Sequence, residues 1–273
     1  MTPVQTTPIP DSFFGSEAQR DLLARGRALF DLLRDDPRFT YYGRGVGLVS
    51  PEDGDFDLLL ALTRLQAVSH YGTVPDARLP EHTQAARAAG LSATLYPRWE
   101  GGAPVLRAAR AILQDHSCPA DITVVRITPE TPDATLAQLA DVALGSGVLP
   151  PAGAVLRGQT RPGLGLVALD GAGKQVACAG AAAYLHPSRN GHAWWGMLAT
   201  DPARRGEKLA LILGAMAIEA MHEDYGFRSF FTGVEAGNTA SEGLCARIGL
   251  APGGTSTLSV ADPSMLPGGR MTK

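Results

Sequence analysis

One stretch in the second half of the chain decides the fold, and it reads Leu198-Ala199-Thr200-Asp201-Pro202-Ala203-Arg204-Arg205-Gly206-Glu207-Lys208-Leu209-Ala210. A β-type run ends at Asp201-Pro202, where proline lacks an N–H for strand pairing, and a helical run begins near Glu207. The first N–H groups of such a helix are unpaired, and together with the helix dipole they bind anions. Gly206 allows a ligand to approach the backbone, and Arg204 and Arg205 add positive charge. The stretch therefore predicts a cradle for a pyrophosphate.

The segments around this stretch alternate between strand and helix patterns. The helix expected over 207–222 is apolar on nearly all sides, because Glu219 is its only charged residue between Leu209 and Met221, so it is expected to be buried. The run 170–174 is rich in Asp and Gly and is typical of a hairpin. The expected strands are 122–127, 163–169, 176–185, 192–200, 229–234 and 255–260, and the expected helices are 135–143, 207–222 and 239–247. This order predicts an α/β fold with a mixed sheet flanked by helices.

A second motif follows the next expected strand and reads Asn238-Thr239-Ala240-Ser241-Glu242-Gly243-Leu244-Cys245-Ala246-Arg247-Ile248-Gly249-Leu250. Taken alone, it is also explained as a helix with a capping box at Thr239 and Glu242 and a C-terminal glycine at Gly249. That explanation does not account for both motifs in this order with a strand between them.

Together the two motifs resemble those of the GNAT acyltransferase superfamily. Arg205 and Ala210 match the ends of the family's Arg/Gln-x-x-Gly-x-Gly/Ala motif, in which Lys208 replaces the central glycine. Asn238, Leu244 and Gly249 match the family's Asn-x-x-Ala/Ser-x-x-Leu-Tyr-x-x-x-Gly-Phe. The resemblance runs from about residue 121 to about residue 265, and implies that 121–273 is a GNAT-like acyl-CoA-binding domain.

The resemblance also implies where the coenzyme, by default acetyl-CoA, would bind. In this family the fourth strand diverges from the fifth, and the pantetheine lies in the gap between them. The residues that this assigns to the coenzyme are Leu198, Ala199, Thr200, Arg204, Arg205, Gly206, Glu207, Lys208, Leu209, Ala210, Asn238 and Ser241. No metal is expected.

Direct transfer to an amine needs a base for the ammonium and an acid for the leaving thiolate. Glu235, just after the fifth strand, is the candidate base, although a solvated loop glutamate is the commoner role. Cys245 stands where the family often has a tyrosine and is the candidate acid, although a small buried helix residue is the alternative. His186 and His192 flank an expected turn that would overhang the acceptor.

Residues 1–120 form a smaller α/β region without a motif of known chemistry. Its expected helices are 16–34, 56–70, 82–89 and 105–113, and its expected strands are 39–50 and 92–96, with the domain boundary within 115–121. A helix–Gly–Leu–strand pattern at 86–91 parallels the one at 246–250, which suggests a degenerate copy of the C-terminal domain. The glycine-rich run 43–47 is not followed by a helix, so dinucleotide binding is poorly supported.

The composition narrows the class of protein. Of 273 residues, 45% are hydrophobic and 19% charged, and the net charge is −3, which suits a packed core and gives no positive field for nucleic acid. The chain start shows no signal peptide, no stretch is long enough to span a membrane, and three scattered cysteines suggest neither disulfides nor zinc. We therefore expect a cytoplasmic N-acetyltransferase for a small-molecule amine, with the oligomeric state open. The alternative is a non-catalytic acyl-CoA-binding regulatory or interaction module.

Overall fold

The computed structural model describes residues 11–184 and 191–271. Its strands are β1 (Phe39–Thr40), β2 (Gly47–Leu48), β3 (Val68–Pro75), β4 (Ser92–Gly101), β5 (Thr123–Arg126), β6 (Gly163–Leu169), β7 (Gln175–Ala183), β8 (His192–Thr200), β9 (Ser229–Gly233) and β10 (Ala251–Ala261). Its α-helices are α1 (Glu17–Leu33), α2 (Phe56–Gln66), α3 (Leu79–Ala88), α4 (Ala103–Asp115), α5 (Asp133–Gly145), α6 (Gly153–Leu156), α7 (Leu209–Tyr225) and α8 (Thr239–Arg247).

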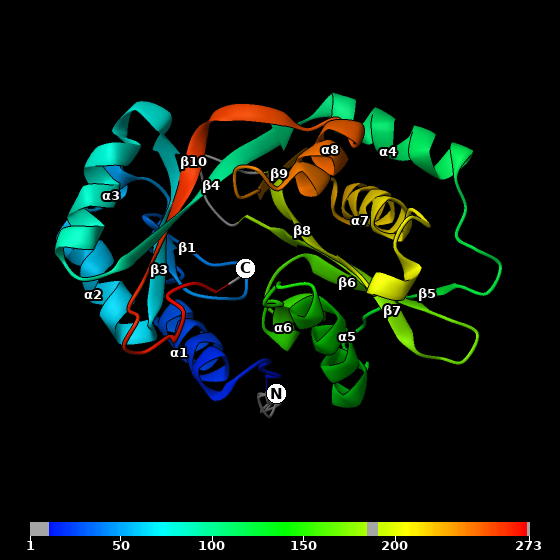
Figure 1. Cartoon of the computed structure of the whole chain (residues 1–273), viewed down its shortest axis with the longest axis horizontal. Helices are drawn as coiled ribbons and strands as arrows, with labels where there is room; N and C mark the ends of the chain where they lie inside the picture. Colours follow the sequence, from blue (N-terminus) through cyan, green and yellow to red (C-terminus); the bar gives the residue numbers. More distant parts are fainter. Residues whose placement is uncertain (1–10, 185–190, 272–273) are drawn as a thin grey trace, which may run out of the picture.

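All the strands form a single mixed sheet that runs through both halves of the chain (Figure 1). Their order is β1-β2-β3-β10-β4-β9-β8-β7-β6-β5. The β2–β3 and β8–β9 pairs are parallel, and the other neighbours are antiparallel. The predicted α/β fold with a mixed sheet is confirmed.

The centre of the sheet is built by an exchange of strands between the two halves. The series α2-β3-α3-β4 in the first half has the same order as α7-β9-α8-β10 in the second. β10 lies between β3 and β4, and β4 lies between β10 and β9, so each half completes the other (Figure 1). Gly90 and Gly249 end the equivalent helices α3 and α8 with φ of 77° and 87°. This arrangement is compatible with the N-terminal half being a degenerate copy of the C-terminal one.

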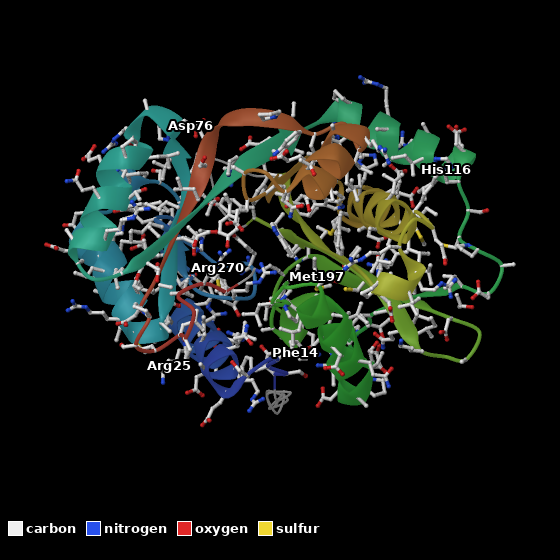
Figure 2. The ribbon with its side chains drawn as sticks, in the orientation of Figure 1. Phe14, Arg25, Asp76, His116, Met197 and Arg270 are labelled. Atoms are coloured by element: carbon white, nitrogen blue, oxygen red, sulfur yellow. The ribbon has the colours of Figure 1, made fainter. Side chains whose placement is uncertain are left out.

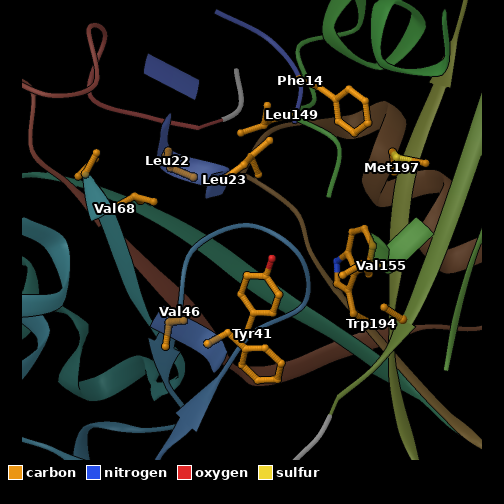
Figure 3. Packing of buried hydrophobic residues seen from close by; sticks show 14 of the residues in the cluster. Phe14, Leu22, Leu23, Tyr41, Val46, Val68, Leu149, Val155, Trp194 and Met197 are labelled. Carbon is orange, nitrogen blue, oxygen red and sulfur yellow. The ribbon is translucent and has the colours of Figure 1, made fainter. Parts of the chain in front are cut away.

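Helices cover both faces of the sheet in the second half. α7 packs on β6, β7 and β8 and is itself covered by α4, while α5 packs on the opposite face. The adjacent tryptophans of β8 separate accordingly: Trp195 faces α7 and donates a hydrogen bond to the carbonyl of Gly214, 3.0 Å away. Trp194 faces the other way and belongs to a core shared by both halves, which includes Tyr41 and Leu149 (Figure 3).

The N-terminal half departs from the sequence prediction in several places. The helix expected over 56–70 ends at Gln66, because Ala67 takes a left-handed φ of 72°, and the unpredicted strand β3 follows at once. β3 is buried on both faces for most of its length, so it lacks the alternating pattern by which strands are recognised. The strand expected over 39–50 is two short strands, that over 92–96 extends to Gly101, and helix α6 was not predicted.

No helix in the described ranges, 11–184 and 191–271, is both long and apolar enough to span a membrane.

Gly90 and Gly249 end equivalent helices, so substitutions at the two positions test the packing of Gly249 against α4. A Cβ on Gly90 meets nothing within 4 Å, whereas one on Gly249 lies 3.0 Å from the carbonyl oxygen of Pro104 at the start of α4. Gly90→Ala should lower the free energy of unfolding by about 1 to 2 kcal/mol through left-handed strain. Gly249→Ala should cost about 1 to 3 kcal/mol more, because the methyl overpacks α4. Denaturant titration measures both; equal losses would contradict the predicted contact.

Candidate active site

The site begins where β8 and β9 part. Their parallel register runs from His192–Ser229 to Trp194–Phe231 and ends there, although β8 continues to Thr200. β8 remains paired with β7 on its other edge, and β9 with β4. The edge of β8 beyond Trp194 therefore faces a gap and can accept an extended ligand as an added strand.

A β-bulge lies in β8 just beyond the parting. Gly196 pairs with Gly180 and Ala199 with Cys178, so Met197 and Leu198 together oppose one residue of β7. Met197 adopts a left-handed φ of 56° and lies near the centre of the molecule (Figure 2). The bulge bends β8 and turns backbone groups at Met197 and Leu198 out of the β7 ladder.

The predicted cradle follows β8. A short 3-10 helix, η4 (Pro202–Arg204), leads through Gly206, whose φ is 87°, to Lys208 and α7. α7 begins at Leu209, two residues later than predicted, because Lys208 itself adopts a left-handed φ of 62° and caps the helix. Lys208 thus takes a conformation that favours glycine, which is the residue the family motif has there.

Hydrogen bonds of Arg204 hold the loop between β8 and α7 in place. The Arg204 guanidinium donates to Glu207 at 2.8 Å and to Asp121, just before β5, at 2.9 and 3.1 Å. These bonds raise the pKa of Arg204, first through Glu207 and then through Asp121. The Arg205 side chain is exposed and has no ion pair within the described part of the chain, so the two neighbouring arginines serve different purposes.

The opposite wall of the gap is formed by the segment after β9 and by α8. Asn238 caps α8, since its side chain accepts a hydrogen bond from the Ser241 N–H at 3.2 Å. The Glu235 carboxylate lies 3.2 Å from the Arg270 guanidinium. Cys245 is buried, and burial, followed by the charge of Glu242, raises the pKa of its thiol to about 12.

These parts surround one cavity of about 880 Å³. The sequence-predicted residues that line it are Leu198, Ala199, Thr200, Arg204, Arg205, Gly206, Lys208, Leu209, Ala210, Glu235, Asn238, Ser241 and Cys245. Glu207 does not line it, because its carboxylate turns to Arg204. His192 also lies off the cavity wall, and His186 is outside the described residues.

The inner end of the cavity is lined by side chains of the N-terminal half that were not predicted from the sequence. Tyr42 stacks on Trp194 with ring centroids 5.7 Å apart, and its ring meets that of Phe231 edge-on at 6.4 Å. Arg44 and His70 line the same end. The one available signal was the glycine-rich run 43–47, whose Gly47 lies directly beneath the His70 ring. It positions side chains and does not form a nucleotide loop.

The comparisons with known proteins agree with this geometry. Residues 139–250 match the profile of the acetyltransferase (GNAT) family. The C-terminal half is a GNAT acetyltransferase domain. The match contains both motifs and the parting strands, so the protein is an N-acetyltransferase of a family that uses acetyl-CoA and acts on an acceptor substrate.

Solved structures with this GNAT fold cover most of the chain. A GCN5-related N-acetyltransferase from Kribbella flavida aligns over 89% of this chain and 95% of its own, with 14% identity and a TM-score of 0.55. A Drosophila protein aligns over 90% and 89%, with 13% identity and a TM-score of 0.54. A GCN5-related N-acetyltransferase-like protein from Streptococcus suis aligns over 82% and 84%, with 16% identity and a TM-score of 0.51. At these identities the likeness shows the fold. No curated protein matches the sequence.

Across residues 11–184 and 191–271, no group of three or more His, Cys, Asp or Glu side chains is placed to hold a metal ion.

Lys208 allows the left-handed strain to be separated from the charge. Lys208→Gly and Lys208→Ala both remove the ammonium, but only glycine relieves the left-handed conformation. We expect the glycine variant to be more stable than the alanine variant by about 1 kcal/mol, as measured by denaturant titration. Equal stabilities would mean that Lys208 does not hold this conformation in solution.

Proposed function

We propose that the protein transfers an acetyl group from acetyl-CoA directly to the amine of a small molecule, such as an amino acid or a related amine. The observation that carries the proposal is the continuity of one cavity from the N-terminus of α7, along the free edge of β8, to a chamber closed by the N-terminal half. A coenzyme can enter at one end of this cavity and an acceptor at the other. Because Tyr42 and Tyr96 help to wall the inner end, it suits a compact acceptor better than a protein tail.

The coenzyme's parts match successive parts of the site. The unpaired N–H groups at the start of α7, with Arg205 and Lys208 beside them, suit the pyrophosphate. The free edge of β8 from Leu198 to Thr200 suits the pantetheine amides. That path leads the thioester toward the bulge and the parting at Trp194, where the aromatic chamber opens.

The chemistry requires a neutral amine. Its nitrogen attacks the thioester carbon, the C–S bond breaks, the amine loses a proton and the departing thiolate gains one. Glu235 lines the cavity and stays our candidate for the base, with Arg270 holding its carboxylate in place. Cys245 lines the cavity too, and burial raises the pKa of its thiol to about 12. Because an ordinary thiol has a pKa of about 8.5, Cys245 is a poor acid toward the departing thiolate, which leaves as the anion and takes its proton from solvent.

The N-terminal half contains the same order of strand, 3-10 helix and α-helix as the predicted pyrophosphate cradle, but its helix N-terminus is not free to bind an anion. β2 is followed by η1 (Pro51–Asp53), Gly54 and α2, just as β8 is followed by η4, Gly206 and α7. Asp55 accepts a hydrogen bond from the Leu58 N–H at 2.9 Å and so occupies the anion-binding end of α2 with a carboxylate.

β2 and β3, which correspond to β8 and β9, leave no gap between them at Gly72. A Cβ on Gly72 of β3 would lie 3.2 Å from the carbonyl oxygen of Val49 and 3.5 Å from that of Leu48, so no ligand fits between β2 and β3 there. We therefore infer that each chain binds one acetyl-CoA, at the C-terminal half.

Two measurements test the proposal. Thermal-shift and calorimetric titration should show that acetyl-CoA stabilises the protein with one site per chain. Stabilisation by NAD and not by acetyl-CoA would refute the acyl-CoA site. Thiol release across a panel of small amines then tests transfer. Binding of acetyl-CoA without release for any amine would favour the non-catalytic module instead.

Arg205 and Arg204 form a matched pair for the cradle. Arg205→Gln should weaken acetyl-CoA binding roughly tenfold through loss of a charged contact to phosphate, and leave the melting temperature unchanged. Arg204→Gln should lower the melting temperature, because it leaves Asp121 and Glu207 without their shared cation. Calorimetry and thermal unfolding separate the two effects; the reverse pattern would contradict these assignments.

Cys245→Ala tests the proton source. Because burial raises the pKa of the thiol to about 12, we expect the variant to keep its turnover number within about threefold, whereas loss of an effective general acid typically costs ~10²-fold or more. Steady-state rates at several pH values measure this. A hundredfold loss with acetyl-CoA binding intact would make Cys245 the acid.

A further inference from the structure

The inner end of the cavity, which we call the acceptor chamber, has flat apolar walls. It is lined by Tyr42, Arg44, His70, Tyr96, Trp194 and Phe231. The Tyr42 and Trp194 rings are nearly parallel, with an interplanar angle of 16°. Such walls contact the apolar body of a small acceptor over a large area and give it little freedom to reorient.

Two guanidinium groups lie against the aromatic walls of the chamber. The Arg44 guanidinium lies 5.1 Å from the centroid of the Trp194 ring, and its Nε donates to the Leu149 carbonyl at 2.7 Å. Arg44 lines the cavity, and among the described residues its Nη1 and Nη2 groups have no hydrogen-bond partner. Arg98, behind the Phe231 ring at 4.0 Å, is a second cation, paired through its Nε with Glu100. Among the described residues that line the cavity, the only carboxylate is that of Glu235, which already pairs with Arg270.

His70 adds a polar atom that has no hydrogen-bond partner. The side chain is 4% exposed, its ring lies flat on Gly47, and its Nε2 is buried without a hydrogen bond. Burial, followed by the charges of Arg98 and Arg44, lowers the pKa of His70 to about 4, so the ring is neutral. A buried polar atom left unpaired is costly, and its presence in the wall of a cavity points to a ligand that satisfies it.

We propose that the acceptor chamber binds a carboxylate, received by Arg44 and His70, so that the acceptor is an amine that also carries a carboxylate, as an amino acid does. This rests on the proposed acyl transfer at the same site. Arg44 lies against Trp194, where β8 and β9 part, so a carboxylate on Arg44 is a short way from the place where the thioester is expected. A short spacing between carboxylate and amine fits this arrangement.

The positive charge serves the chemistry too. An ammonium ion is disfavoured beside Arg44, because like charges repel more strongly in a buried site. Arg44 therefore holds the carboxylate and favours the neutral amine that attacks the thioester. An amine without a carboxylate makes no ion pair with Arg44. The free energy needed to deprotonate its ammonium group is therefore not offset by binding.

The proposal is tested with matched acceptors, phenylalanine against phenylalaninamide and leucine against leucinamide, in the thiol-release assay. The amides have the less basic, more readily deprotonated amine and would react faster if the chamber ignored the carboxylate. We expect the acids to have kcat/KM values at least tenfold higher. Arg44→Gln should reduce the acid-to-amide ratio to one or below, Arg44→Lys should keep part of it, and Arg25→Gln, on the exposed face of α1, should leave it unchanged.

A binding measurement makes the test independent of turnover. Calorimetry with CoA present compares N-acetylphenylalanine and N-acetylleucine with their amides, and the acids should bind the native chain more tightly and lose that advantage in Arg44→Gln. The proposal is overturned if acid and amide bind equally or if the amides bind more tightly. It is also overturned if none of the four compounds binds. Acetyl-CoA binding and thiol release from other amines report separately on acyl transfer, so the two failures are distinguishable.

Discussion

The site depends on the break in pairing between β8 and β9 after Trp194 and Phe231. A sheet interrupted at its centre is tolerated here because each strand keeps its other neighbour, β7 for β8 and β4 for β9. The bulge at Met197 bends β8 away and prevents the ladder from closing again. One interruption thus creates the free strand edge that we propose for the coenzyme and, at its inner end, the chamber that we propose for the acceptor.

The strand exchange determines what that chamber contains. β4 comes from the N-terminal half but pairs directly with β9, where Arg98 lies opposite Gly233. It carries Arg98, paired with Glu100 of the same strand, to the face of the Phe231 ring. β3, held against β10, brings His70 to the same chamber. In the function that we propose, the C-terminal half binds the coenzyme, and side chains of both halves contact the acceptor.

Sequence alone predicted the structural elements of the proposed coenzyme site well and those of the proposed acceptor chamber hardly at all. The cradle, β8 and α8 are specified by consecutive residues, so local signals such as Pro202, Gly206 and the Asn238 cap were sufficient. The chamber draws on residues from five separate segments, namely the β1–β2 connection, β3, β4, β8 and β9, and only the non-local order of the sheet brings them together. β3 was missed because its burial on both faces removes the alternating pattern, and His70 was missed with it. The parallel between 86–91 and 246–250 was the one trace of the exchange in the sequence.

Because strands are exchanged, the predicted domain boundary near residue 120 does not separate two independent sheets. In the sequence the boundary falls between α4 and β5, but β4, which comes before it, lies between β9 and β10, which come after it. A chain begun at residue 121 would leave both strands with an unpaired edge where β4 had been, and exposed edges of this kind favour aggregation. The same cut removes Arg44 and His70 from the chamber and Arg98 from behind Phe231. The fold is compatible with the two halves being repeats, strand pairing makes them one sheet, and the acceptor chamber exists only where both are present.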